Sequence, residues 1–303
     1  MNTITTEELF IELTSELSNT FQFLNDKPEE TLESTLKACW FKSAGIPKSA
    51  IKAMEEPLPE LNEKQIKVLL QLIGQRQKNI PLAHLTGRQN FMGIELLSDK
   101  RALIPRKETE ILGKKALEIS NNFANEKDDY VFVIDTCCGA GNLGLAVAFY
   151  NSKSKVIVTD LSHDAVELAK ENICFLNLSQ RVKAMQGDLF SAVDQEKFYE
   201  RIDMIICNPP YISTAKVTKM NSEISAHEPV LAFDGGMFGT KIIQRFLSEA
   251  PKFLIEGGSV IFEVGVGQGE FMIRLCKEAN HYSDIETVTD HLGNIRVIHA
   301  KKK

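Results

Sequence analysis

The chain has 303 residues, of which 43% are hydrophobic and 25% are charged, and its formal net charge is −6 at pH 7. This length suits one large domain or two ordinary ones, with enough apolar residues to bury a sizeable core. The negative balance argues against a protein whose main partner is naked nucleic acid, because phosphate binding depends on Lys and Arg. We therefore expect no stable complex with nucleic acid.

Residues 1–85 are predicted to form a small helical domain. Apolar residues recur there at three- and four-residue spacing, and prolines and glycines separate the repeats. No segment shows the alternation of a strand. The predicted helices are Glu7–Leu24, Pro28–Ala44, Pro47–Met54 and Asn62–Arg76.

Residues 86–110 change character and are interpreted as a connector. Gly87, Gly93 and Pro105 interrupt the helical pattern, and the segment Asn90–Leu96 is typical of a hairpin. A helix at Lys107–Ser120 is expected next, followed by a polar loop at Asn121–Asp129.

Residues 111–303 are predicted to form an α/β domain, because strands and helices alternate along them. The predicted strands are Val131–Thr136, Lys155–Thr159, Val182–Gln186, Met204–Cys207 and Gly258–Val264. The predicted helices are Leu143–Tyr150, His163–Leu176, Thr240–Phe253 and Gly269–Ala279. Two last strands, Ile285–Thr289 and Ile295–Ala300, surround a turn at Gly293. This order predicts a doubly wound parallel sheet with a hairpin at one edge.

Acidic residues follow three successive predicted strands. Asp135 opens a loop of small residues, Cys137, Cys138, Gly139, Ala140 and Gly141, while Asp160 and Asp188 end the next two strands. Ligands of open α/β sheets bind at these strand ends. The acids suit S-adenosylmethionine, with Asp160 accepting from the ribose hydroxyls, Asp188 from the adenine amine and Leu189 packing on the purine. Alternatively, Asp160 and Asp188 only cap the following helices.

A stiff turn, Asn208-Pro209-Pro210-Tyr211, follows the fourth predicted strand. Proline restricts the residue before it to extended or turn geometry, so the Asn208 side chain and the Pro209 carbonyl are held in place. Two fixed acceptors of this kind can hydrogen-bond to a planar –NH2 group, and Tyr211 can pack against one side of that group. The alternative is that Asn208 only stabilises an Asx turn.

The remaining reactive side chains point to no metal. None of the six cysteines forms a C-x-x-C pair, and the histidines lack ligand spacing. Cys137 and Cys138 are interpreted as small packing residues. The first residues lack the features of a signal peptide, and no apolar run approaches the ~18 residues of a membrane span. We expect a cytoplasmic monomer with reduced thiols.

The chain resembles the protein-(glutamine-N5) methyltransferases that modify class I peptide chain release factors. The resemblance extends from about Pro81 to the end and more loosely over the helical segment. The motif Leu103–Glu110 is the most discriminating, since the Asn208–Tyr211 turn is shared with methyltransferases of nucleic-acid bases. The other matches are Pro81–Gly87, Asp135–Gly141, Asn208–Ile212, Glu228–Gly236, Glu263–Gly265, Asp290, Gly293 and Arg296.

The resemblance implies a helical domain that binds the release factor and a Rossmann-like, seven-stranded methyltransferase sheet. It implies that S-adenosylmethionine contacts the loop, Asp160, Leu189 and Asn208, and that the substrate glutamine lies against the Asn208–Tyr211 turn. Arg106 and Glu110, one helical turn apart, are expected to order the connector over the site or to contact substrate. Phe91 is expected to line the substrate entrance or to pack in the hairpin.

Several positions depart from the family pattern. In the loop, Cys137 stands where Gly is usual, and Cys138 and Ala140 stand where Thr or Ser is usual. Elsewhere, Lys107 replaces a usual Pro, His84 replaces a usual Tyr, and Leu189 stands where many members carry Trp. Three alternatives stay open: a paralogue that methylates a small-molecule or peptide amide, a methyltransferase of nucleic-acid bases, and a non-catalytic binding protein. The intact turn and the strand-end acids argue against the last.

Overall fold

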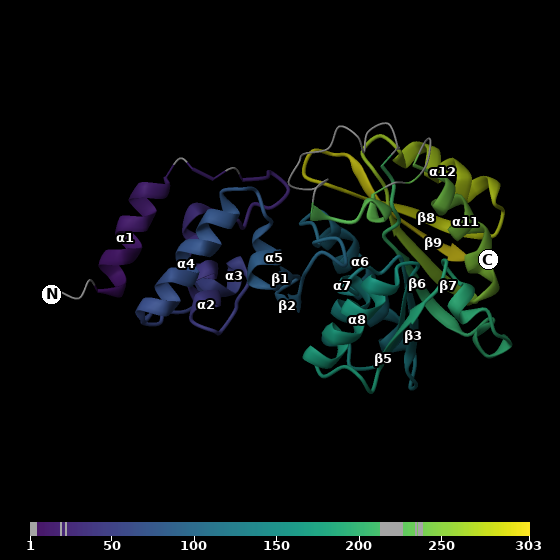
Figure 1. The fold of residues 1–303 in the computed structure, drawn as a ribbon. Coiled ribbons are helices and arrows are strands. Elements are labelled where there is room, and N and C mark those ends of the chain that lie inside the picture. The colour runs from purple at the N-terminus through teal and green to yellow at the C-terminus, as the bar shows by residue number, and fades with distance from the viewer. Residues whose placement is uncertain (1–4, 19, 22, 213–226, 234, 236–238) are drawn as a thin grey trace. The chain divides into compact units, whose positions relative to one another are not determined.

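The computed structural model describes residues 5–18, 20–21, 23–212, 227–233, 235 and 239–303 (Figure 1). They form two compact units. The first contains the described residues up to Lys100, the segment Ile104–Lys107, and His227 with Glu228. The second contains Arg101–Leu103 and the described residues of 108–220 and 229–303. The domain boundaries expected from the sequence stay predictions.

The first unit is helical, as predicted. Its helices are α1 (Thr6–Leu17), α2 (Leu32–Ser43), α3 (Ala50–Met54), α4 (Glu63–Arg76) and α5 (Leu82–Thr86). Side chains of Thr5, Thr31, Ser49 and Asn62 accept backbone N–H groups at the first four N-termini. The cap at Thr31 explains why α2 begins later than predicted. Helix α5 is a single short turn that the sequence pattern did not reveal.

The predicted hairpin is confirmed. Strand β1 (Arg88–Phe91) pairs antiparallel with β2 (Ile94–Leu97). The two residues of the turn, Met92 and Gly93, have φ of 51° and 84°, as the tight turns of hairpins require. Asn90 Oδ1 accepts the Gly93 N–H at 3.1 Å and closes the turn.

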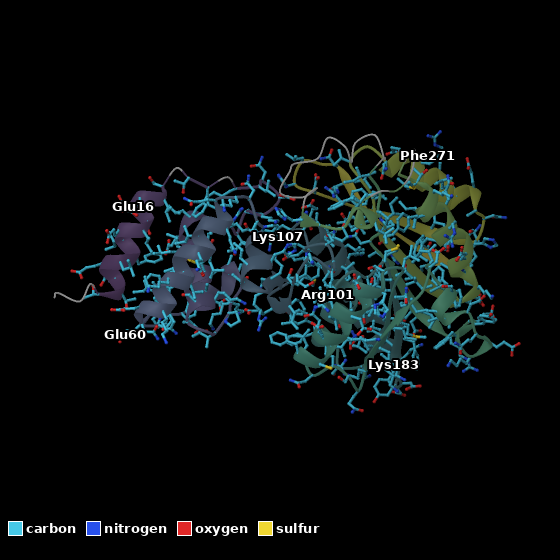
Figure 2. The ribbon with its side chains drawn as sticks, viewed as in Figure 1. Glu16, Glu60, Arg101, Lys107, Lys183 and Phe271 are labelled. Atoms are coloured by element: carbon cyan, nitrogen blue, oxygen red, sulfur yellow. The ribbon has the colours of Figure 1, made fainter. Side chains whose placement is uncertain are left out.

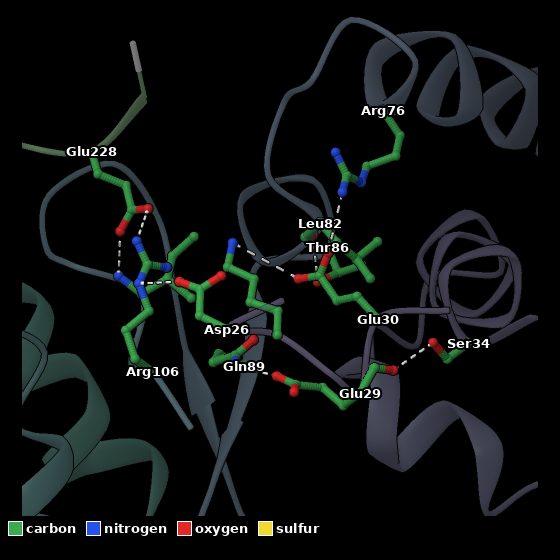
Figure 3. Close-up of polar contacts among 12 residues, drawn as sticks. Asp26, Glu29, Glu30, Ser34, Arg76, Leu82, Thr86, Gln89, Arg106 and Glu228 are labelled. Atoms are coloured by element: carbon green, nitrogen blue, oxygen red, sulfur yellow. Dashed lines mark hydrogen bonds and ion pairs between the residues drawn. The ribbon is translucent and has the colours of Figure 1, made fainter. Parts of the chain in front are cut away.

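Charged side chains are buried in the interior of the first unit (Figure 3). Lys27, Glu30 and Arg76 are at most 4% exposed, and Arg76 Nη2 lies 3.3 Å from Glu30 Oε2. Arg106 pairs with Asp26 at 3.3 Å and with Glu228 at 2.6 Å. Glu228 also accepts the Ile104 N–H at 2.9 Å. These ion pairs hold three segments distant in sequence together. By contrast, Glu16 and Glu60 are exposed, as are Lys107 and Lys183 (Figure 2).

The second unit contains the seven-stranded sheet, ordered β5-β4-β3-β6-β7-β9-β8. Neighbours from β5 to β7 run parallel, while β9 is antiparallel to β7 and β8. The strands are β3 (Val131–Thr136), β4 (Ser154–Asp160), β5 (Val182–Gln186), β6 (Ile202–Cys207), β7 (Leu254–Glu263), β8 (Tyr282–Thr289) and β9 (Ile295–Lys302). This order confirms the predicted α/β class and the C-terminal hairpin.

Helices α6 (Thr109–Glu126), α7 (Asn142–Tyr150), α8 (His163–Phe175), α11 (Lys241–Glu249) and α12 (Gly269–Glu278) flank this sheet (Figure 1). The loop predicted at Asn121–Asp129 is wrong up to Glu126, since α6 continues through it. Phe123 and Ala124 are half-buried and extend the apolar face of α6. Lys153 Nζ donates to the Ala124 carbonyl at 3.0 Å, which stabilises the last turn.

The core of the second unit is apolar and aromatic. Phe190 stacks on Phe253 with ring centroids 4.8 Å apart, and Phe246 of α11 meets Phe262 of β7 edge-on at 5.8 Å. Helix α11 ends at Glu249, earlier than predicted, because Pro251 starts a 3-10 turn, Ala250–Lys252. No helix among the described residues combines the length and apolarity that crossing a membrane requires.

We predict that Glu30→Ala destabilises the first unit by about 3–5 kcal/mol, because it leaves buried cations without their carboxylate. Trp40, the single tryptophan of the chain, is buried in this unit and reports its unfolding by fluorescence in urea. The control is Glu55→Ala, which removes an exposed partner of Lys52 and is expected to cost under about 1 kcal/mol. Equal urea midpoints for both variants would contradict the prediction.

Candidate functional site

Four parallel strands, β5, β4, β3 and β6, end at one edge of the sheet. The parallel pairing brings the residues that follow each strand to the same edge, where ligands of α/β sheets bind. The structure therefore gathers the predicted loop, Asp160, Asp188 and Asn208 at one place.

The loop after β3 has an unusual backbone. Cys137, Gly139 and Gly141 have φ of 55°, 54° and 86°. The Gly139 N–H donates to Asp160 Oδ2 at 2.9 Å, and the Cys138 N–H donates to the Thr159 carbonyl at 3.0 Å. The loop is thus tied to the end of β4, and it leads directly into the N-terminus of α7.

Asp135 is fully buried at the end of β3. Its Oδ2 accepts the Gly144 N–H at 2.8 Å, whereas its Oδ1 has no hydrogen-bond partner within the described part of the chain. Burial raises the pKa of Asp135 to about 7, and the nearby Asp160 carboxylate adds to the rise. In this structure Asp135 anchors α7 under the loop, and direct contact with the cofactor stays a prediction.

Asp160 is half-buried, and its two oxygens hold backbone N–H groups of Ser162 and Gly139. Burial raises the pKa of Asp160, while these N–H groups lower it. The carboxylate therefore orders both the loop and the start of α8. Each oxygen still has a lone pair for a ligand hydroxyl.

Asp188 and Leu189 are placed differently from each other. Asp188 is paired with Arg245, whose Nη1 lies 2.9 and 3.1 Å from the two carboxylate oxygens. Leu189 has a φ of 50°, and its side chain is buried in the apolar core. Contacts of these two residues with an adenine stay predictions.

The two cysteines of the loop are protonated at neutral pH. A hydrogen bond with Cys207, together with burial, raises the pKa of the Cys137 thiol well above its ordinary value. Burial, with the nearby Asp160 and Asp135 carboxylates, has the same effect on the pKa of Cys138. Neither thiol is activated as a nucleophile. The described residues contain no group of three or more His, Cys, Asp or Glu side chains placed to hold a metal ion.

The Asn208–Tyr211 turn is held from several sides. Asn208 is half-buried, and its Nδ2 donates to Thr109 Oγ1 at 3.4 Å. The Tyr211 hydroxyl donates to Glu263 Oε1 at 2.8 Å, and the Tyr211 carbonyl accepts from Gln268 Nε2 at 3.0 Å. The turn is therefore fixed both by its prolines and by tertiary hydrogen bonds.

Sequence reasoning assigned no role to four residues that support this turn. Thr109, Glu263 and Arg296 lie inside the quoted motifs, and Gln268 follows one of them. Glu263 ends the apolar strand β7 and is 1% exposed. An acidic residue in so apolar a run is the signal that could have revealed it.

The predicted substrate residues fall in different parts of the chain. Phe91 is buried at the end of β1, and Arg106 makes the ion pairs of the first unit described above. Glu110 lies in the first turn of α6 and pairs with Lys114 at 3.9 Å. Their contacts with substrate stay predictions. Asp234 and Gly236 of the matching motif lie outside the described residues.

A family model described as "Methyltransferase small domain" matches residues 119–238. This range contains the strand-end loop, all three acids and the Asn208–Tyr211 turn. The sheet order, the site and this match define the chain as an S-adenosylmethionine-dependent methyltransferase.

The names of similar proteins identify the family within this class of methyltransferases. The chain is 33% identical to a release factor glutamine methyltransferase of Clostridium acetobutylicum, over 80% of this chain and 82% of that protein. It is 33% identical to the Bacillus cereus enzyme of the same name, over 80% and 83%. A Rhodopirellula baltica enzyme of that name is 28% identical over 93% and 94%. The chain belongs to the release factor glutamine methyltransferase family, which confirms the resemblance.

We predict that the free energy of unfolding of Asp135→Asn increases relative to that of the wild type as pH rises from about 4 to about 7. The folded-state pKa of Asp135 is raised to about 7, so the acid contributes stability at low pH and loses it as pH rises through that value. The amide keeps the shape and neutrality of the protonated acid without titrating.

The measurement is calorimetric unfolding of both proteins at pH 5 and pH 8 without added cofactor. The difference in unfolding free energy, variant minus wild type, should be larger at pH 8. The same difference at both pH values would show that Asp135 does not titrate in this window.

Proposed function

We propose that this chain transfers the methyl group of S-adenosylmethionine to the side-chain amide nitrogen of a glutamine, in the Gly-Gly-Gln segment of a class I peptide chain release factor. The observation that carries the proposal is the Asn208–Tyr211 turn at the end of β6, whose Asn208 amide is held through its nitrogen by Thr109. The names of the relatives support the choice of substrate.

The residues at the strand ends fit this cofactor. Asp160 offers acceptor oxygens for the two hydroxyls of a ribose, and Asp188 offers them for an amine. The left-handed conformation at Gly139 leaves the space beside its backbone open to a ligand, whereas a Cβ at Gly141 would press on Leu145 and Ala169. When bound, S-adenosylmethionine supplies an electrophilic methyl group on a sulfonium.

The task left to the protein is to orient a poor nucleophile. The nitrogen lone pair of an amide is delocalised into the carbonyl, so the substrate nitrogen must be held in line with the methyl group. Orientation of this kind can supply on the order of 7–11 kcal/mol. The Asn208 Oδ1 and the Pro209 carbonyl each accept one N–H of the glutamine amide.

The same two acceptors stabilise the positive charge that grows on the nitrogen during transfer. Tyr211, tied to Glu263 and Gln268, closes the turn as a rigid wall. The methylated amide cation is a strong acid and loses its extra proton readily to water, so no dedicated base is needed. Arg106 and Glu110 are assigned to ordering the approach of the substrate, and the helical first unit to binding the release factor. The 1% exposure of Phe91 supports its alternative role, packing in the hairpin.

The first test measures transfer of label from S-adenosylmethionine. The substrates are a class I release factor, the same factor with its Gly-Gly-Gln glutamine mutated, and duplex DNA. We expect label on the first alone. Label on DNA would identify a base methyltransferase and overturn the proposal. Label on none would contradict the release factor as substrate and favour a small-molecule or peptide amide.

The second test removes the acceptor. Asn208→Ala should lower kcat/KM for the release factor by about 10²–10³-fold, the usual cost of losing one such group. Cofactor binding measured by calorimetry should change little. Asn151→Ala is the matched control, because it removes a buried amide that donates to Ser120 outside the site. Near-normal turnover of Asn208→Ala would contradict the role of Asn208 in orienting the substrate amide.

A further inference from the structure

The Asn208–Tyr211 turn has few hydrogen-bond donors of its own. Pro209 and Pro210 carry no N–H group, so this part of the backbone can be held only through its carbonyls and its ends. Just beyond the turn, the Ile212 N–H donates to the Phe233 carbonyl at 3.0 Å. The direction in which the turn presents its acceptors therefore depends on groups from other segments.

Gln268 is one of these groups, and it holds the turn by its backbone. The Gln268 Nε2 donates to the Tyr211 carbonyl at 3.0 Å, and its Oε1 accepts the Gly265 N–H at 2.9 Å. A backbone carbonyl can only accept and a backbone N–H can only donate, so these two partners fix which end of the amide faces each of them. The side chain thus bridges the segment after β7 to the last peptide group of the turn.

The Gln268 side chain projects from an ordered backbone. The residue directly precedes helix α12, its own N–H donates to the Gly265 carbonyl at 3.0 Å, and its carbonyl accepts the Met272 N–H at 3.1 Å. A Cβ at Gly239 would lie 2.0 Å from the Tyr211 carbonyl oxygen and 2.9 Å from Gln268 Nε2. A Cβ at Gly265 would lie 2.9 Å from Gln268 Oε1. The absence of side chains at both glycines leaves the space that the bridge occupies.

The prolines transmit this hold toward the acceptors of the substrate. Their rings lock φ at Pro209 and Pro210, so few backbone torsions between Tyr211 and Asn208 can still rotate. The Tyr211 ring is tied separately, through its hydroxyl, to Glu263 at 2.8 Å. A shift of the Tyr211 peptide group would therefore carry the Pro209 carbonyl with it.

We infer that Gln268 is a positioning residue for methyl transfer, which holds the Tyr211 carbonyl and through it sets the direction of the two acceptors, Asn208 Oδ1 and the Pro209 carbonyl. This inference rests on the proposed function. Because Gln268 acts through the turn, its loss should affect the rate of transfer more than the binding of S-adenosylmethionine.

The first kinetic test is Gln268→Met, which keeps nearly the length of glutamine without the polar amide. It should lower kcat for the release factor by about 10- to 100-fold at every pH, the usual cost of misplacing a reacting group. The Kd for S-adenosylmethionine, measured by calorimetry, should change by less than about threefold. A wild-type kcat in Gln268→Met would contradict the inference.

Gln268→Glu has a pH signature that a merely structural role would not produce. A protonated carboxyl keeps both bonds, since its carbonyl oxygen accepts from Gly265 and its O–H donates to Tyr211, whereas a carboxylate has no donor. A glutamate carboxyl ordinarily has a pKa of about 4.3, and a partner that can only accept raises this pKa. The ratio of kcat in Gln268→Glu to kcat in the wild type should therefore rise about 5- to 10-fold as pH falls from about 8 to about 5. A flat ratio would overturn the inference.

Asn151→Asp is the matched control, because the Asn151 amide also bridges two backbone groups. Its Oδ1 accepts the Lys153 N–H at 3.0 Å, and its Nδ2 donates to the Ser120 carbonyl at 3.1 Å. Asn151 lies between α7 and β4, at the opposite edge of the sheet from the site. The kcat ratio of Asn151→Asp to the wild type should stay flat over the same pH range. A matching rise would assign the pH response to folding and rule out the inference.

A spectrum of the turn keeps the inference separate from the proposed function. Tyr211-Ile212 is the one Tyr-Ile pair of the chain, so ¹³C in the tyrosine carbonyl and ¹⁵N in isoleucine give a single coupled signal for this peptide group. Gln268→Met should move the carbonyl resonance upfield, as the loss of a hydrogen bond does, and Gln268→Glu should restore it as pH falls.

An unchanged carbonyl resonance in Gln268→Met would show that Gln268 does not hold the turn, and the inference would fail. If the wild-type enzyme methylates no release factor, the proposed function fails instead, and the spectrum still decides whether Gln268 holds the Tyr211 carbonyl.

Discussion

The Glu263 carboxylate is the group on which the geometry of the site depends. It lies buried at the end of β7, one strand away from the Asn208–Tyr211 turn, and takes hydrogen bonds from Tyr211 of that turn and Arg296 of β9. Both hydrogen bonds reach its Oε1, whereas its Oε2 has no hydrogen-bond partner among the described residues. A buried carboxylate is costly unless its charge is paired. The contacts of Glu263 with Arg296 and Tyr211 therefore tie the turn to β7 and β9.

The first unit applies the same rule for a different purpose. Glu30 is buried with Lys27 and Arg76, and Arg106 is held between Asp26 and Glu228. Removing a shared partner such as Glu30 is costly, because both buried cations lose a countercharge at once. In this unit the ion pairs hold together segments that lie far apart in the sequence.

Local patterns predicted most of the regular elements. Strands β3 and β5 were predicted with their observed bounds, because apolar runs bounded by turn residues define a buried strand well. The errors lie where tertiary contacts decide an end. Helix α6 continues through Asn121 and Asn122 because Phe123 packs and Lys153 caps the last turn. Helix α5 is too short for a periodic pattern to show.

The sequence by itself determined the fold class, the family and the gathering of acids and Asn208 at one sheet edge. It could do so because alternating strands and helices imply a parallel sheet, whose strand ends lie together, and because motifs are local in the chain. Only the tertiary structure decided what each site residue contacts: Asp188 pairs with Arg245, Asp135 is buried under the loop, and Thr109 meets Asn208 across 99 positions of sequence. Spacing along a chain predicts which groups are present, whereas hydrogen-bond polarity depends on neighbours that only folding brings together.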